Sequence, residues 1–257
     1  MRSFAEKLFV GVAGVICLSI LAVSLPGGEA PEQPKVSSYA PAADLVSQVD
    51  YFLKHLGEAL ADKSAYDDVQ QTAVERDSNT LAVLGLVLAL HDEDHKLKSA
   101  APAIIKTSQA LAENYEDFDK ATAALADLKK AVAGEVPTED EVTWGAVASM
   151  SPLMKQVPVV HAPMQRGATD ARRFKKQAAQ TAGQAATLAA IAQAAMFNTD
   201  HATEDQIPQW EKLCAQMRDA CGALNSAVHS GNAAKSAEAI VTLQKSCDDC
   251  HAVFRSE

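Results

Sequence analysis

A short run near the C-terminus, Cys247 to His251, carries two thiols and an imidazole in the pattern C-x-x-C-H. On an α-helix, positions i, i+3 and i+4 share one face, so Cys247, Cys250 and His251 are expected to point the same way. This is the attachment pattern of a c-type haem, in which each thiol bonds to one vinyl group and the imidazole ligates the iron. The pattern therefore predicts one covalently bound haem c.

Three other interpretations of the C-x-x-C pair stay open: a structural disulfide, a redox-active pair and half of a zinc site. A zinc site needs a second pair of ligands at suitable spacing, and Cys214 and Cys221 are seven residues apart, which is poor for chelation. On one helix they lie about 10 Å apart, too far for a disulfide, and are expected to be buried small side chains. A redox pair usually accompanies a βαβ pattern, and no strand pattern is evident. Haem attachment is preferred.

Composition favours helices and limits the classes of ligand. The 257 residues are rich in Ala and Leu, which are strong helix formers, and only 5% are aromatic. The net charge of −10 argues against nucleic acid and anionic membrane surfaces as ligands. It is compatible with a redox partner protein that presents a basic face. Five cysteines in a chain of this length do not indicate a disulfide-rich protein.

The N-terminus has the features of an exported protein. Arg2 and Lys7 precede an apolar run that ends before Pro26, so residues 1–26 are interpreted as a signal peptide or an N-terminal membrane anchor. Residues 27–42 form a Pro-rich linker, expected to be an extended tether. Both alternatives predict a periplasmic or extracytoplasmic location, with membrane contact only through the N-terminal segment.

Apolar residues recur at helical spacing along the rest of the chain. In residues 43–135 they predict four helices, with the approximate ranges 42–60, 67–90, 101–115 and 120–132. The segment 141–257 repeats the scheme, with Thr80-Leu81-Ala82 echoed by Thr187-Leu188-Ala189. The expected fold is all-α, with two tandem four-helix bundles of up-down-up-down topology. A single irregular helical domain is the alternative.

The same alignment predicts haem only in the C-terminal bundle. Opposite the attachment residues Cys247, Cys250 and His251 stand side chains that neither attach nor ligate a haem: Val132, Glu135 and Val136. The first bundle is therefore expected to be haem-free and to serve docking, dimerisation or spacing, which leaves a homodimer possible.

From about Thr143 to Glu257 the sequence resembles the class II c-type cytochromes, the cytochrome c′ family. These four-helix bundles carry C-x-x-C-H near the chain end, followed by an aromatic and a basic residue, here Phe254 and Arg255. The resemblance implies that His251 is the proximal ligand and that Arg255 lies against its imidazole or reaches a propionate. A solvated charge at a helix end is the alternative for Arg255. The whole first half departs from the family pattern.

The resemblance also implies that the distal side comes from the first helix of the second bundle. Six-coordinate members of the family use a methionine there, and five-coordinate members have an apolar residue. Met154 is the preferred ligand among the three methionines of this stretch, Met150, Met154 and Met164, although methionine is also a common core filler. His161 is a further candidate. Prolines in the stretch are expected to kink the helix: Pro152, Pro158 and Pro163.

These features predict a monohaem electron carrier rather than an enzyme. A haem peroxidase would want a distal acid–base pair, and none is evident in the sequence. The alternative function is a high-spin protein of the cytochrome c′ type that binds nitric oxide or carbon monoxide at an open distal site. An interaction module, in which the haem-free half does the binding, is a further class.

Overall fold

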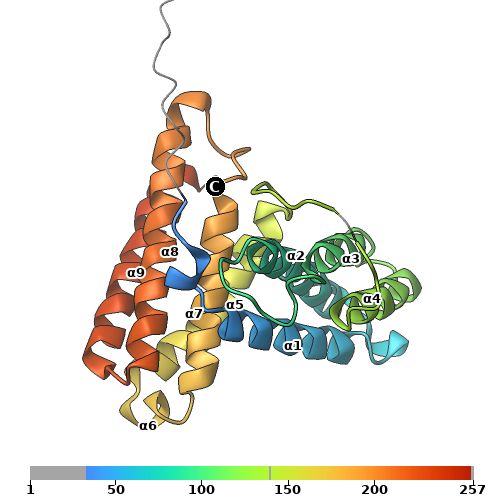
Figure 1. Cartoon of the computed structure of the whole chain (residues 1–257), viewed down its shortest axis with the longest axis horizontal. Helices are drawn as coiled ribbons and strands as arrows, with labels where there is room; N and C mark the ends of the chain where they lie inside the picture. The colour runs from blue at the N-terminus through green and yellow to red at the C-terminus, as the bar shows by residue number, and fades with distance from the viewer. Residues whose placement is uncertain (1–32, 139, 256–257) are drawn as a thin grey trace, which may run out of the picture. The chain divides into compact units, whose positions relative to one another are not determined.

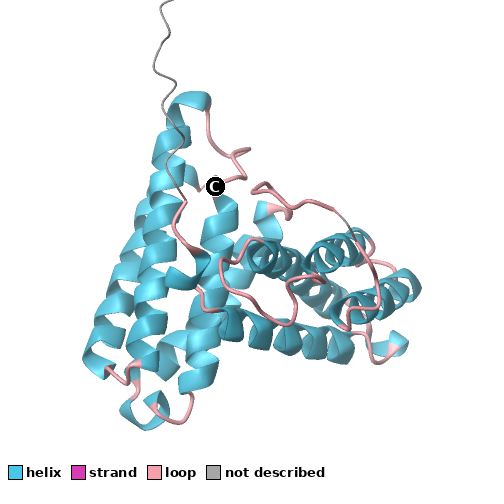
Figure 2. Ribbon diagram, in the orientation of Figure 1, coloured by secondary structure: helices cyan, strands magenta, loops and turns pink. Residues whose placement is uncertain are grey.

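The structure is a computed structural model that describes residues 33–138 and 140–255, and within these ranges it contains helices and no strand (Figures 1 and 2). This confirms the all-α class. The α-helices are α1 (Ala42–Ala59), α2 (Asp68–Ala89), α3 (Ala101–Glu113), α4 (Phe118–Val132), α5 (Met150–Thr169), α6 (Ala171–Phe174), α7 (Ala178–Ala195), α8 (Ile207–His229) and α9 (Ala233–Phe254).

Helices α1 to α4 agree with the four sequence-predicted helices to within two residues at each end. Two of them begin at an aspartate whose carboxylate accepts backbone hydrogen bonds from the first turn, which satisfies donors that have no partner inside the helix. Asp67 accepts from Val69 N at the start of α2, and Asp117 accepts from Asp119 N at the start of α4. Helix α4 ends at Val132, whereas α9 carries its attachment pattern within the helix.

Helix α7 is the central helix of the core. It is buried continuously from Thr181 to Ala195, and it contacts α1, α2, α5 and α8. Its small residues allow this close approach: a Cβ at Gly183 would come within 2.4 Å of Nε2 of Gln48 on α1. Residues 34–257 form one compact unit that contains both halves of the chain. The finer arrangement, two tandem four-helix bundles, stays a prediction.

Helix α5 continues through the prolines that were expected to kink it. Pro152 lies in the first turn, where a backbone N–H has no partner within the helix, and so its cost is small. Pro158 and Pro163 lie inside the helix, and neither ends it.

Helices α7, α8 and α9 lie side by side (Figure 1). The chain reverses between α8 and α9 through Gly231, whose φ of +68° favours glycine, and Asn232, whose side chain accepts from Lys235 N at 3.0 Å. This tight turn directs α9 back along α8, so that the attachment pattern lies beside the first turns of α8.

The expected extended tether is wrong for the part of the linker that the structure describes. Val36, Tyr39 and Ala40 are buried, because their apolar side chains gain more from packing than from water. Tyr39 lies directly over Gly222 of α8, where an added Cβ would meet it at 2.9 Å. The predicted signal peptide or anchor, residues 1–26, lies outside the described residues. Among the described helices, none has the length and apolar character needed to span a membrane.

Candidate functional site

Helices α5, α7, α8 and α9 line a half-open cavity of about 690 Å³ at the C-terminal end of α9. Its volume lies within the range of roughly 300–1,000 Å³ that is common for small-molecule and cofactor sites. Most of the lining is apolar: Met150, Met154, Val157, Pro158, Ile191, Ala192, Ala195, Trp210, Leu213, Met217 and Phe254. Such a lining suits a flat apolar ligand with few polar groups.

One face of α9 presents the sequence-predicted residues to this cavity. Cys247, Cys250, His251 and Arg255 all line it, as the helical spacing predicted. The two thiols are partly buried, whereas His251 and Arg255 are exposed at the rim. The two thiols of the attachment pattern therefore lie on the cavity wall, and His251 lies at its solvent-exposed edge.

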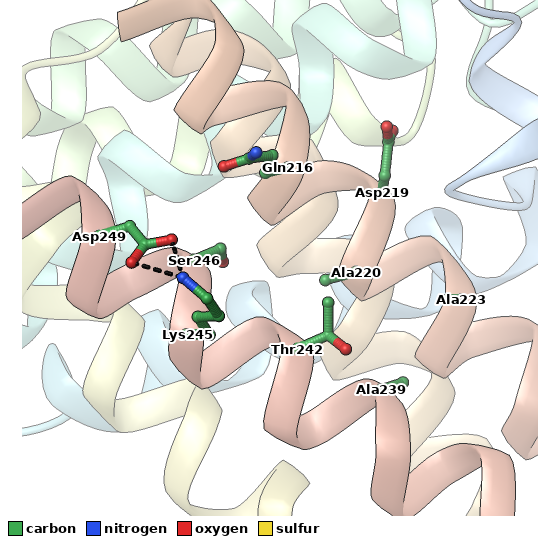
Figure 3. A pocket seen from close by; sticks show the side chains of 9 residues that line it. All are labelled: Gln216, Asp219, Ala220, Ala223, Ala239, Thr242, Lys245, Ser246 and Asp249. Atoms are coloured by element: carbon green, nitrogen blue, oxygen red, sulfur yellow. Dashed lines mark hydrogen bonds and ion pairs between the residues drawn. The ribbon is translucent and has the colours of Figure 1, made fainter. Parts of the chain in front are cut away.

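The two acidic residues between the cysteines are tied to the preceding helical turn. Asp249 accepts from Nζ of Lys245 at 2.6 Å (Figure 3), and Asp248 accepts from Nε2 of Gln244 at 2.9 Å. Lys245 and Asp249 also line a second hollow, of about 450 Å³, between α8 and α9. No cysteine, histidine or aromatic residue lines this second hollow, so it is not the candidate cofactor site.

Helix α8 brings two further thiols behind the attachment pair. Cys214 and Cys221 are buried and free, as expected, and Cys214 also lines the cavity. Burial raises the pKa of Cys214 to about 12, with a smaller contribution from nearby Cys250. Burial also raises the pKa of Cys247 and that of Cys250. A cysteine in this environment is a protonated thiol at neutral pH.

From the raised pKa of Cys214 we expect the folded protein to lose stability at alkaline pH. Its folded pKa lies above the unfolded value of about 8.5, so as pH rises the unfolded state loses this proton first and is favoured. Between about pH 9 and 10.5, we expect the unfolding free energy to fall by on the order of 2 kcal/mol more in the wild type than in Cys214→Ala. Denaturant titrations at several pH values measure this, and parallel pH dependences would contradict it.

Helix α5 forms the wall opposite the attachment pattern and runs antiparallel to α9. Near one end, Oγ of Ser236 on α9 donates to the carbonyl of Ala168 on α5 at 3.3 Å. His251 lies 15 residues beyond Ser236, so in a regular antiparallel register the α5 residue at its level is close to Leu153. Met154 is the cavity-lining methionine closest to this level.

His161 lines the same cavity farther along α5. By the same register it lies about 12 Å from the level of His251, since each helical residue advances 1.5 Å. Its Nε2 is buried and has no hydrogen-bond partner among the described residues, and burial lowers the pKa of the imidazole. Met164, the third methionine of α5, is fully buried and does not line the cavity.

Two cavity residues have no signal in the sequence that could have identified them. His201 reaches the cavity from the connection between α7 and α8. Trp210 lies edge-on to Phe254, with ring centroids 5.1 Å apart, and its Nε1 donates to the carbonyl of Ala195 at 2.7 Å. Only the approach of three helices places Trp210 beside the attachment pattern.

Comparisons with known proteins do not assign the chain to a family. No family model, curated protein or solved structure matches it. The interpretation of the cavity therefore depends on its own residues.

The residues of the cavity fit a covalently attached haem. Two reduced thiols and an imidazole share one wall, a thioether faces them, and the remaining lining is largely apolar. The described residues contain no cluster of three or more His, Cys, Asp or Glu side chains that could hold a metal ion alone. A haem iron does not need such a cluster, because the porphyrin supplies four nitrogens and the protein supplies only axial ligands.

Proposed function

We propose that this protein is a monohaem c-type cytochrome that transfers electrons, with haem c attached covalently to Cys247 and Cys250. The observation that carries the proposal is the shared cavity, where both thiols, His251 and Met154 lie on facing walls. The motif alone is compatible with a disulfide or a redox pair. A large apolar cavity beside the thiols favours attachment of an apolar prosthetic group.

Each cavity residue has a role in this proposal. The thiols of Cys247 and Cys250 hold the group covalently, and the imidazole of His251 is the proximal ligand. Arg255, at the C-terminal cap of α9, would hold a propionate by charge. The apolar wall around Trp210 excludes water, which limits reorganisation around the metal. When bound, the haem supplies an iron that alternates between the ferrous and ferric states.

Met154 is proposed as the distal ligand. Counting helical residues from the Ser236–Ala168 contact puts Met154 nearest the level of His251 and His161 about 12 Å farther along α5, which supports Met154 over His161. A thioether opposite an imidazole raises the reduction potential and suits an electron carrier. If Met154 does not ligate, the distal site is open, and binding of nitric oxide or carbon monoxide becomes the function.

The proposal extends to partners, location and domain organisation. The net charge of −10 suits a redox partner protein with a basic face, and nucleic acid is not expected to bind. We place the protein in the periplasm or another extracytoplasmic compartment, with the membrane reached only through residues 1–26. The tandem arrangement, a haem-free bundle followed by a haem bundle, belongs to the same proposal, as does a possible homodimer. No enzymatic activity is proposed.

A Met154→Leu substitution tests the function. We expect the wild-type ferric protein to be low-spin, with the far-red band of methionine-ligated iron, and the variant to become high-spin and to bind carbon monoxide when reduced. Absorption spectra of the purified holoproteins measure both. Leucine keeps most of the apolar volume, so the cavity wall is preserved.

Met164→Leu is the matched control, because Met164 lies on the same helix, is fully buried and does not line the cavity. Its spectrum is expected to match the wild type. A wild-type protein that is already high-spin and takes up carbon monoxide would overturn the electron-transfer assignment in favour of gas binding.

A further inference from the structure

Helices α1 to α4, the N-terminal half, contribute no residue to the lining of the cavity, yet α2 and α3 contact the segment that leads into the cavity wall. Nε2 of Gln109 on α3 donates to the carbonyl of Val147 at 2.9 Å. Oδ1 of Asn79 on α2 accepts from the backbone N–H of Ser149 at 3.0 Å. Both contacts hold the three residues just before α5, which begins at Met150.

A third contact reaches the cavity wall itself. Nζ of Lys155 on α5 lies 3.2 Å from Oε2 of Glu75 on α2, and Lys155 lines the cavity beside Met154. The carboxylate of Glu75 is mostly buried, with a side-chain exposure of 19%, so solvent screens this ion pair less than an open surface pair. The ion pair between Lys155 and Glu75 therefore links the second turn of α5 to α2.

The amide of Asn79 is held in one orientation. Its Nδ2 donates to the carbonyl of Glu75 at 2.8 Å, which leaves Oδ1 to accept from Ser149. Asn79 is only 7% exposed and its bond to Ser149 is partly buried, so the loss of its carbonyl would leave the Ser149 N–H with no partner in the protein. Ser149 makes no side-chain cap to its own helix, which increases the importance of the contact with Asn79.

The held segment is the part of α5 that faces the attachment pattern. Met150 and Met154 both lie within one or two turns of the Asn79 contact, and both line the cavity. On the other side, Nδ2 of Asn198, which follows α7, donates to the carbonyl of Ala148 at 2.9 Å. The beginning of α5 is thus fixed between the N-terminal half and the connection after α7.

We propose that the N-terminal half positions the distal wall of the cavity, and that Glu75, Asn79 and Gln109 are its positioning residues. They act through α5 and set how closely the Met154 thioether approaches the iron. This inference rests on the proposed haem function. It assigns to the haem-free half a role in controlling the site, beyond the docking, dimerisation or spacing expected from the sequence.

The test uses Asn79→Ala and Glu75→Gln in the full-length holoprotein. We expect each variant to keep covalent haem but to lose part of the far-red methionine band. We also expect the affinity of the reduced protein for carbon monoxide to rise in Asn79→Ala by up to about tenfold, the upper order set by loss of one partly buried hydrogen bond. The reduction potential should fall in parallel, because methionine ligation raises it.

Asp119→Asn is the matched control, since it breaks an ion pair with Lys63 at 2.5 Å inside the N-terminal half, away from α5. It should leave the spectrum and the carbon monoxide affinity unchanged. Should Asn79→Ala fail to fold, Glu75→Gln and Gln109→Ala decide the question by the same readouts.

Two results distinguish failure of this inference from failure of the proposed function. Unchanged spectra, affinities and potentials in all folded variants, with covalent haem and methionine ligation present in the wild type, would overturn the positioning role alone. Absence of covalent haem from the wild type would overturn the proposed function. If Met154 does not ligate the iron in the wild type, the same variants still decide the question. A changed affinity for carbon monoxide supports the positioning role of the N-terminal half, and an unchanged affinity overturns it.

Discussion

Replacing both Cys247 and Cys250 by alanine is expected to abolish covalent haem completely. Both thiols line the cavity from one face of α9, and the proposal gives the haem no other covalent anchor. Each single variant should retain one thioether and a reduced yield of holoprotein. Haem staining of the denatured protein, together with its intact mass, measures the attachment directly, because any haem held only by ligation is lost on denaturation.

The other cysteine pair supplies the control. Cys214 and Cys221 are free and buried on α8, close behind the attachment pair, but they lie outside the C-x-x-C-H pattern. The Cys214→Ala, Cys221→Ala double variant should keep a full complement of covalent haem. Haem that stayed on the denatured Cys247→Ala, Cys250→Ala protein would show that the attachment assignment is wrong.

Truncation of Trp210 is expected to produce the largest loss of stability among the cavity residues. The indole is 4% exposed, donates to the Ala195 carbonyl at 2.7 Å and lies edge-on to Phe254. Removal of a buried tryptophan side chain typically lowers the free energy of unfolding by about 3–5 kcal/mol, because the apolar transfer term and a residual cavity both contribute. Denaturant unfolding of Trp210→Ala measures this loss.

Two variants separate the contributions of the indole. Trp210→Phe keeps an apolar ring but loses the hydrogen bond, so it should cost roughly 1–3 kcal/mol. Trp144→Ala removes the partly exposed tryptophan that stacks on Phe197 at 5.6 Å, and it should cost less than Trp210→Ala. If Trp210→Ala lowers the free energy of unfolding by less than Trp144→Ala does, the stabilising role assigned to Trp210 is wrong.

Local patterns in the sequence were sufficient to predict the helices and the face of α9. Apolar residues at helical spacing predicted α1 to α4 to within two residues at each end. The i, i+3 and i+4 spacing predicted that Cys247, Cys250 and His251 share a face. Both signals depend on neighbours within one or two turns, and such neighbours are set by the chain order alone.

The linker shows the limit of local reasoning. Three prolines among polar residues favoured an extended tether, yet Tyr39 and Ala40 are buried. Gly222, far along the chain, leaves room for Tyr39 on the surface of α8. A segment with few periodic features can pack wherever a distant surface is complementary to it.

The sequence by itself determined the helical class, the bounds of the early helices and the common face of the attachment residues. The tertiary structure alone decided that Met154 and His251 line one cavity, that Trp210 packs edge-on against Phe254 in its wall, and that Asn79 accepts a hydrogen bond at the start of α5. The physical reason is sequence distance: the two residues of each pair stand about 40 to 100 positions apart in the chain. Their geometry depends on how helices pack and in which register, and no local pattern encodes it.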